Sequence, residues 1–220
     1  MPVTLTSSPV DTIVWDFGAV LFRWRPQVLL AAALPQRVTD DASAAYWREA
    51  FFQSFGGDWA EFDRGTVAAD ELAQRIARRT GLALDEAHAV IGAVPGELQP
   101  LADTVALVHA LRGAGHRQFY LSNMPVPYAD HLEREHAFVR DFEDGLFSGR
   151  VNLIKPDAAL FALAEERFGL VPGRTVFVDD HPRNVEAARE RGWHAVLATD
   201  AQAIEQGLAA HGLLRGALAA

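Results

Sequence analysis

The sequence contains no cysteine among its 220 residues, which excludes disulfide bonds, metal sites built on thiolates and catalysis by a cysteine nucleophile. Long hydrophobic runs are also missing, because no stretch reaches the roughly 18 apolar residues that a transmembrane helix requires. The first residues, MPVTLTSSPVD, lack the basic and apolar regions of a secretory signal peptide. From these absences we expect a soluble protein with a cytoplasmic location.

Positive charge is scarce, since 20 lysine and arginine residues face 29 aspartate and glutamate residues and the formal net charge is -9. Nonspecific binding to nucleic acid or to an anionic membrane needs a basic surface, so we expect neither partner. Hydrophobic residues make up 50% of the chain, which is enough for a substantial core without cross-links. The length suits one large domain, or a core that carries a sizeable insertion.

The stretch Thr12–Phe22, TIVWDFGAVLF, begins with a strand pattern. Its residues 13–15 form a short apolar run rich in β-branched side chains, which is typical of a strand buried on both faces. The run ends at Asp16, and a buried carboxylate there costs free energy unless a cation, usually a metal ion or a lysine, pairs with it. Ligands bind beyond the carboxyl ends of strands in parallel α/β sheets, so Asp16 is the first candidate for chemistry.

The next part of the chain is rich in alanine, leucine, glutamate and arginine and has no strand pattern before about Pro95. Glycine and proline divide it into segments with apolar faces that could pack as a helical bundle. The four predicted helices are Gln27–Leu34, Ala42–Phe55, Ala68–Thr80 and Leu84–Ile91. The aromatic side chains of this region are expected to form its core: Trp47, Phe51, Phe52, Phe55 and Trp59.

From Pro100 onward, strands and helices alternate, which predicts a parallel sheet with helices on both faces. The expected fold class is therefore α/β, a doubly wound parallel sheet with a helical insertion after its first strand. Further extended segments are predicted at Arg117–Leu121, Val151–Ile154, Thr175–Val178 and Ala195–Leu197. The predicted helices are Leu101–Gly113, Tyr128–Phe138, Asp157–Phe168, Asn184–Arg191 and Ala201–Ala210.

Polar residues follow four of these extended segments and would meet at one edge of a parallel sheet. They are Asp16, Ser122 with Asn123, Lys155, and Asp179 with Asp180. Together they supply a carboxylate nucleophile, a hydroxyl and an amide, a cation and an acidic pair. This combination predicts chemistry on a phosphoryl group.

In this prediction, the Asp16 carboxylate attacks phosphorus, and the reaction passes through an aspartyl-phosphate. Magnesium prefers oxygen ligands, which Asp16, Asp180 and Asp179 could supply together with the phosphate. The metal ion would neutralise charge between the nucleophile and the phosphate. Lys155 and the Ser122 hydroxyl would hold the phosphoryl oxygens.

The four motifs resemble, in this order, those of the haloacid dehalogenase-like (HAD) hydrolase superfamily: Asp16 to Val20, Ser122-Asn123, Lys155-Pro156 and Asp179-Asp180. The resemblance covers nearly the whole chain and includes a helical cap placed as in the C1-cap group. It implies a core of residues 1–25 and 96–220 and a cap of residues 26–95. It also implies that Asp16 is the nucleophile, that Ser122 and Lys155 bind phosphate and that the acidic pair holds Mg²⁺.

The stretch Asp179 to Asn184, DDHPRN, further resembles the branch of sugar-phosphate phosphatases and the N-terminal phosphatase domain of soluble epoxide hydrolases. A small phosphorylated metabolite, such as a sugar phosphate, is then the expected substrate. Because the cap shapes substrate choice in this family, one or two of the aromatic side chains of the helical region could face the active site. Trp24 and Arg25, just beyond the first strand, are better candidates for contact with the substrate.

Gly18 departs from the family pattern, because most phosphatases of the superfamily carry a second aspartate at this position as general acid and base. The glycine carbonyl can still bind Mg²⁺, but glycine cannot protonate a leaving group, and losing such catalysis costs roughly 10²–10⁴-fold in rate. His181 is one candidate for a substitute proton donor. Glycine also occurs at this position in sequences that resemble the sugar-phosphate phosphatase branch.

Two alternatives follow from Gly18. A metal-free 2-haloacid dehalogenase would use Asp16 to displace halide from carbon and likewise lacks the second aspartate, but the pair Asp179 and Asp180 would then place uncompensated negative charge beside the nucleophile. A catalytically weakened protein that binds phosphorylated metabolites or a protein partner is the other alternative.

Overall fold

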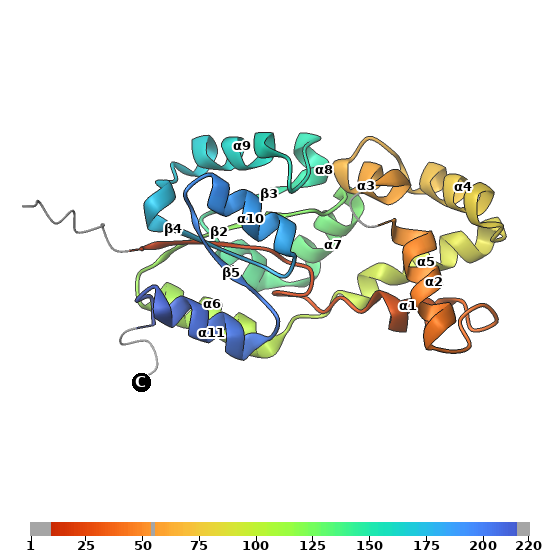
Figure 1. The fold of residues 1–220 in the computed structure, drawn as a ribbon, viewed down its shortest axis with the longest axis horizontal. Coiled ribbons are helices and arrows are strands. Elements are labelled where there is room, and N and C mark those ends of the chain that lie inside the picture. Colours follow the sequence, from red (N-terminus) through yellow and green to blue (C-terminus); the bar gives the residue numbers. More distant parts are fainter. Residues whose placement is uncertain (1–9, 54–55, 215–220) are drawn as a thin grey trace, which may run out of the picture.

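The computed structural model describes residues 10–53 and 56–214. Five parallel strands form one sheet in the order β3-β2-β1-β4-β5 (Figure 1). The strands are β1 (Thr12–Trp15), β2 (Arg117–Ser122), β3 (Asp144–Phe147), β4 (Thr175–Asp179) and β5 (His194–Leu197). The expected α/β fold with a parallel sheet is confirmed.

Helices cover both faces of this sheet, so that β1 is buried on each side. Ile13 and Trp15 join the larger apolar cluster with α6 (Ala102–Gly113), α7 (Val126–Glu135) and α11 (Ala201–Ala210). Val14 points to the opposite face and packs with side chains of α9 (Ala158–Phe168) and α10 (Pro182–Glu190). The side chains of Ile13, Val14 and Trp15 are fully buried, as the apolar run predicts.

In the described part of the chain, five helices, rather than the four predicted, lie between β1 and α6 and form the helical insertion (Figure 1). The additional one, α3 (Gly57–Arg64), lies in a stretch that the sequence analysis treated as a break between helices. Its C-terminal glycine, Gly65, adopts φ +80°, the left-handed conformation that commonly ends a helix. The other four are α1 (Pro26–Ala33), α2 (Asp41–Phe52), α4 (Ala69–Thr80) and α5 (Leu84–Glu97).

The aromatic residues of the insertion pack against one another, as predicted. The Trp59 ring lies edge-on to Phe52 at 4.6 Å and to Phe62 at 5.6 Å, and Trp47 and Phe51 are also buried. Phe55, which was expected at the end of the second helix, lies outside the described residues.

Two adjacent chain segments connect the insertion to the sheet. The Arg23 N–H donates to the Gln99 carbonyl, and the Leu101 N–H donates to the Leu21 carbonyl. These bonds hold the outgoing and returning chain together near the carboxyl end of β1. The boundaries 1–25, 26–95 and 96–220 stay a prediction.

The prediction of an extended segment at Val151–Ile154 was wrong. The edge strand is instead β3, and a short helix, α8 (Ser148–Val151), follows it directly. The Asp-Gly pair at the start of β3 is typical of a turn, but Gly145 is paired with Tyr120 of β2. A side chain at Gly145 would collide with the Tyr120 ring, so this strand depends on a tertiary contact that local sequence does not reveal. Within the described residues, the helices are too short or too polar to cross a membrane.

Candidate active site

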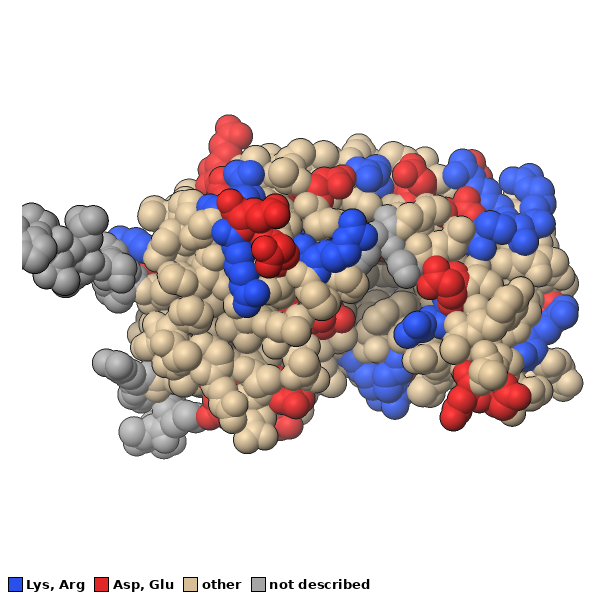
Figure 2. Space-filling view, viewed as in Figure 1, with Lys and Arg blue, Asp and Glu red and all other residues tan. Residues whose placement is uncertain are grey.

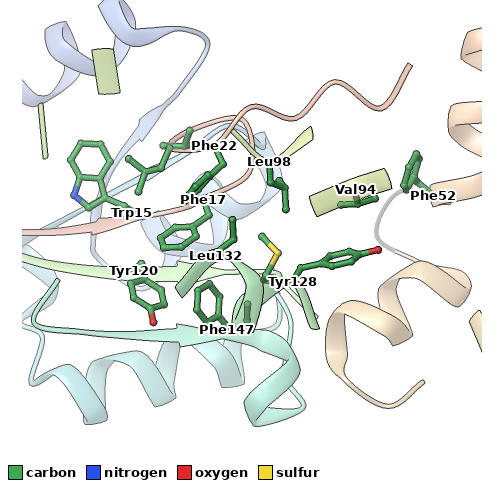
Figure 3. Close-up of a cluster of buried hydrophobic side chains, with 14 of the residues drawn as sticks. Trp15, Phe17, Phe22, Phe52, Val94, Leu98, Tyr120, Tyr128, Leu132 and Phe147 are labelled. Atoms are coloured by element: carbon green, nitrogen blue, oxygen red, sulfur yellow. The ribbon is translucent and has the colours of Figure 1, made fainter. Parts of the chain in front are cut away.

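Asp16 lies directly beyond β1, between the ends of β2 and β4. Its backbone N–H donates to the Val178 carbonyl, so the strand pairing continues to the residue itself. The Phe17 carbonyl then accepts three backbone N–H groups, from residues 20–22, which turns the chain back tightly. The Phe17 ring lies near Tyr120 and Phe147 (Figure 3), with its centroid 4.8 and 5.2 Å from theirs. This packing fixes the loop that carries Asp16.

Lys155, the only lysine in the sequence, reaches this edge of the sheet from the loop after α8. Its Nζ lies 2.7 Å from Asp16 Oδ1 and 2.6 Å from Asp179 Oδ2, and the side chain is 1% exposed. Burial alone would lower the pKa of Lys155, but the two carboxylates outweigh it and raise the pKa. The ammonium group therefore stays charged and keeps Asp16 oriented.

Asp179 is fully buried, and both of its carboxylate oxygens are already engaged. Besides Lys155, they accept hydrogen bonds from the Asn184 side chain and from the His181 N–H. This arrangement suits a residue that positions Lys155. A role for Asp179 as a metal ligand stays a prediction.

The motif at the end of β2 divides into two functions. The Asn123 side-chain amide donates to the Lys155 carbonyl at 3.0 Å and accepts from the Lys155 N–H at 2.8 Å. Both of its polar groups therefore hold the loop of Lys155 and do not point at a ligand. The Ser122 hydroxyl is buried, 1% exposed as a residue, and has no hydrogen-bond partner among the described residues. A buried hydroxyl without a partner is costly and is accounted for when a bound group supplies the bond.

The acidic residues at this edge fit a divalent cation. Asp16, Asp179 and Asp180 each place one carboxylate oxygen within 4.8 Å of the others. Burial raises the pKa of Asp16 to about 6, with Lys155 opposing the shift and Asp179 adding to it. Desolvation and the neighbouring Asp16 charge raise the pKa of Asp180 to about 7. Carboxylates crowded in this way gain from a cation, and oxygen is the ligand that Mg²⁺ prefers.

Mg²⁺ is expected to raise the melting temperature of the protein, because the acidic cluster exists only in the folded chain. At a hundred times the dissociation constant, one bound ion stabilises the fold by about 2.7 kcal/mol. For a chain of this size, that corresponds to a shift of roughly 5–10 °C. Scanning calorimetry with and without Mg²⁺ measures it.

Asp180→Asn is expected to abolish most of this thermal shift, whereas Asp103→Asn, on the exposed surface of α6, should leave it unchanged. An equal Mg²⁺ effect in both variants would place the ion elsewhere.

Asp63, on α3, is the functional candidate that the sequence analysis missed. It lines the same cavity as Gly18, close to where the missing second aspartate would stand. Burial raises the pKa of Asp63 well above its usual value, the Asp16 charge adds to this shift and Lys155 opposes it. The signal was weak, because an aspartate in a short helix flanked by glycines is typical of an exposed turn.

Contacts with α8 hold α3, and with it Asp63, against the edge of the sheet. The Ser148 hydroxyl donates to the Asp63 carbonyl at 2.6 Å and accepts from the Met124 N–H at 2.8 Å. A Cβ atom at Gly65 would lie 2.3 Å from the Gly149 carbonyl oxygen. The two backbone segments therefore approach so closely that only glycine fits at this position.

The two predicted substrate contacts at the start of the insertion have different surroundings. Trp24 lines the cavity beside Gly18 and a second, wider cleft that continues from it. Arg25 instead pairs with Glu97, through bonds of 2.8 and 3.1 Å, and Arg23 joins the same carboxylate. Arg25 thus ties together the two segments that connect the insertion to the sheet.

The cleft between the sheet and the insertion opens on the face drawn in Figure 2, where the surface is hollowed between the two parts. It has a volume of about 410 Å³ and is lined by Trp24, Trp59 and Asp63, with Arg48 and His181 at the same cleft. The His181 Nδ1 accepts the Arg183 N–H at the start of α10, and burial lowers the pKa of His181. A neutral imidazole that caps a helix is a poor source of a proton at neutral pH.

The model of the haloacid dehalogenase-like hydrolase family matches residues 10–192. The chain belongs to this family. The resemblance of the four motifs is thereby confirmed, and the protein is a HAD-like hydrolase.

The relatives of this HAD-like hydrolase include two kinds of enzyme. The sesquiterpene phosphatase astK of Aspergillus oryzae is 28% identical over 86% of this chain and 90% of its own length. The (S)-2-haloacid dehalogenase of Pseudomonas putida is 25% identical over 70% of this chain and 69% of its own length. A HAD-family enzyme of Bacteroides thetaiotaomicron, solved with magnesium and inorganic phosphate, has a TM-score of 0.64 at 20% identity and covers 84% of this chain and 92% of that one. This last likeness shows the shared fold.

Proposed function

We propose that this HAD-like hydrolase is a magnesium-dependent phosphatase that cleaves a small phosphate monoester through an aspartyl-phosphate on Asp16. One observation carries the proposal: the Asp16 carboxylate, held by Lys155, lies beside a buried Ser122 hydroxyl that lacks a partner in the described chain. A phosphoryl oxygen would complete the bonding of that hydroxyl. The relative named as a sesquiterpene phosphatase agrees with this reaction class.

In the first half-reaction, a carboxylate oxygen of Asp16 attacks phosphorus and forms the new P–O bond. The bond between phosphorus and the ester oxygen breaks, and its electron pair leaves with the alcohol. Lys155 and Ser122 hold the phosphoryl oxygens while negative charge shifts toward the leaving oxygen.

In the second half-reaction, water attacks the phosphorus of the aspartyl-phosphate. The P–O bond to Asp16 breaks, the Asp16 carboxylate is restored and inorganic phosphate leaves. A bound divalent cation, held by Asp16 and Asp180 with the predicted Gly18 carbonyl, would supply charge neutralisation between the nucleophile and the phosphate.

Asp63 is the proton donor that this reaction requires in place of a residue at Gly18. A carboxyl group kept neutral by burial can protonate the leaving oxygen, and the resulting carboxylate can take the proton of the attacking water. The group comes from the insertion instead of the sheet, but it faces the same cavity as Gly18. His181 is less suitable because its pKa is lowered and its Nδ1 already accepts a backbone hydrogen bond.

The rival reaction, metal-free displacement of halide from a 2-haloacid, is supported by Gly18 and by the relatives named as haloacid dehalogenases. The acidic cluster weighs against it. Without a cation, Asp180 and Asp16 would have to ionise side by side, and the Asp16 charge already raises the pKa of Asp180.

A substrate panel with and without Mg²⁺ distinguishes these reactions. We expect phosphate release that needs both Mg²⁺ and Asp16. Halide release in excess EDTA would establish the dehalogenase instead. If neither phosphate nor halide release depends on Asp16, the chain is a binding protein and the enzyme proposal fails.

A further inference from the structure

A cavity of about 120 Å³ lies near the carboxyl ends of β1 and β2. It is bounded by Gly18, two residues beyond the nucleophile, and by Asn123, next to Ser122. A side chain built at Gly18 would meet nothing within 4 Å, so the glycine adds its own space to the cavity. A group bonded to a phosphate at Asp16 can extend into this cavity.

The side chains that line this cavity are mostly apolar and come from both parts of the molecule. The insertion contributes Trp59 and Val94, the segments that connect it to the sheet contribute Trp24 and Leu98, and the loop and helix after β2 contribute Met124 and Tyr128. Figure 3 shows Val94, Leu98 and Tyr128 on the side of the apolar cluster that faces the insertion. The Trp59 ring packs edge-on against Phe52 at 4.6 Å, which fixes this part of the wall.

The polar groups in these walls are largely paired already. The Tyr128 hydroxyl donates to the Ile91 carbonyl at 2.8 Å, and the Asn123 amide is engaged with the backbone of Lys155. Asp63 carries the only carboxyl group among the described residues that line the cavity, and none of these residues is basic. A sugar bound here would bury several hydroxyl groups with too few partners, whereas a hydrocarbon needs no such partners.

We propose that the substrate is the phosphate monoester of an apolar alcohol, whose hydrocarbon part occupies the cavity formed by Trp24, Trp59 and Tyr128. This inference rests on the proposed phosphatase activity and names its substrate class. A cavity of about 150 Å³ holds a benzene molecule, so this one holds roughly five carbon atoms. A longer chain continues into the wider cleft, which shares Trp24 and Trp59 with the cavity.

A series of alkyl phosphonates from ethyl to hexyl tests the cavity on the wild-type full chain, because these compounds are not hydrolysed. Calorimetric titration in the presence of Mg²⁺ is expected to give a dissociation constant that falls about fourfold with each added methylene, until the cavity is full. A dissociation constant that does not change with chain length would overturn the proposal. This measurement does not depend on turnover, so it stays informative even if the proposed reaction is wrong.

Hydrolysis provides the second measurement. We expect kcat/KM for hexyl phosphate to exceed that for glucose 6-phosphate about a hundredfold or more. Phosphate release that depends on Asp16 but favours the sugar phosphate would refute the substrate class and leave the phosphatase reaction intact. Failure of every phosphate ester, despite tight phosphonate binding, would refute the reaction and leave the cavity assignment intact.

Met124→Gln tests the wall itself, because glutamine has a similar length and adds an amide. The stepwise gain from longer phosphonates is expected to shrink to less than about twofold per methylene. Leu84→Gln, which makes the same kind of change at a leucine that is 44% exposed, should leave the fourfold step unchanged. If the dissociation constant falls by the same factor per methylene in both variants, Met124 does not contact the alkyl chain and the assignment is contradicted. If Met124→Gln does not fold, the wild-type series still decides.

Discussion

Replacing Asp16 with asparagine is expected to reduce phosphate release by roughly 10⁴- to 10⁶-fold, the range observed when a covalent nucleophile is removed. Asparagine has the same size and can accept the bond from Lys155, but its amide does not attack phosphorus. Lys155 also retains Asp179 at 2.6 Å, so the geometry of the site should survive. Initial rates with saturating Mg²⁺ and an alkyl phosphate measure the effect.

Thermal unfolding separates a lost nucleophile from a damaged fold. Burial raises the pKa of Asp16 to about 6, above its value in the unfolded chain. A carboxyl group with a raised folded-state pKa stabilises the fold least when it is ionised, so this contribution falls as the pH rises from about 4 through about 6 and does not change further above that. The asparagine variant should therefore melt no lower than the wild type at pH 8. Turnover within about tenfold of the wild type would instead place the nucleophile at another residue.

The convergence of Asp16, Ser122, Asp179 and Asp180 could be predicted because it depends on few facts. A wholly apolar three-residue run must be buried, and parallel strands align their carboxyl ends at one edge. The observed register then brings Asp16 level with the ends of β2 and β4. Lys155 reaches this edge even though the extended segment predicted before it does not exist, because its partners are Asp16, directly beyond β1, and Asp179, at the end of β4.

The detailed roles within the site could not be predicted, because they depend on which partners each side chain finds. Asn123 and Arg25 look like ligand-binding residues from their positions in the chain. In the folded protein Asn123 holds the backbone of Lys155, and Arg25 pairs with Glu97, 72 residues away. A short-range pattern carries no information about a bond of that kind.

The contribution of α3 was hidden for a related reason. Its eight residues are too few to show a helical period against the surrounding glycines, and packing against α8 stabilises it more than its own propensity does. Asp63 becomes buried beside Gly18 only when the insertion packs against the edge of the sheet. The residue that we propose in place of the second aspartate therefore lies 45 positions away from Gly18.

Asp63→Asn is expected to lower turnover of an alkyl phosphate by roughly 10²–10⁴-fold, the contribution of general acid–base catalysis. Asparagine fills the same space and keeps the cavity, but it cannot donate a proton to the leaving oxygen. p-Nitrophenyl phosphate, whose leaving group is a much stronger acid than an alkyl alcohol, should lose far less in the step that forms the aspartyl-phosphate. Comparing single-turnover rates for the two substrates isolates the proton transfer.

Restoring a carboxyl group from the other side of the cavity completes the test. Gly18→Asp in the Asp63→Asn background has room for its Cβ, because nothing lies within 4 Å of that position. It is expected to recover part of the lost rate on alkyl phosphate, whereas Gly18→Asn in the same background should recover none. Recovery by both variants would mean that bulk rather than a proton was missing. Recovery by aspartate alone would establish that this enzyme moved its acid from the sheet to the helical insertion.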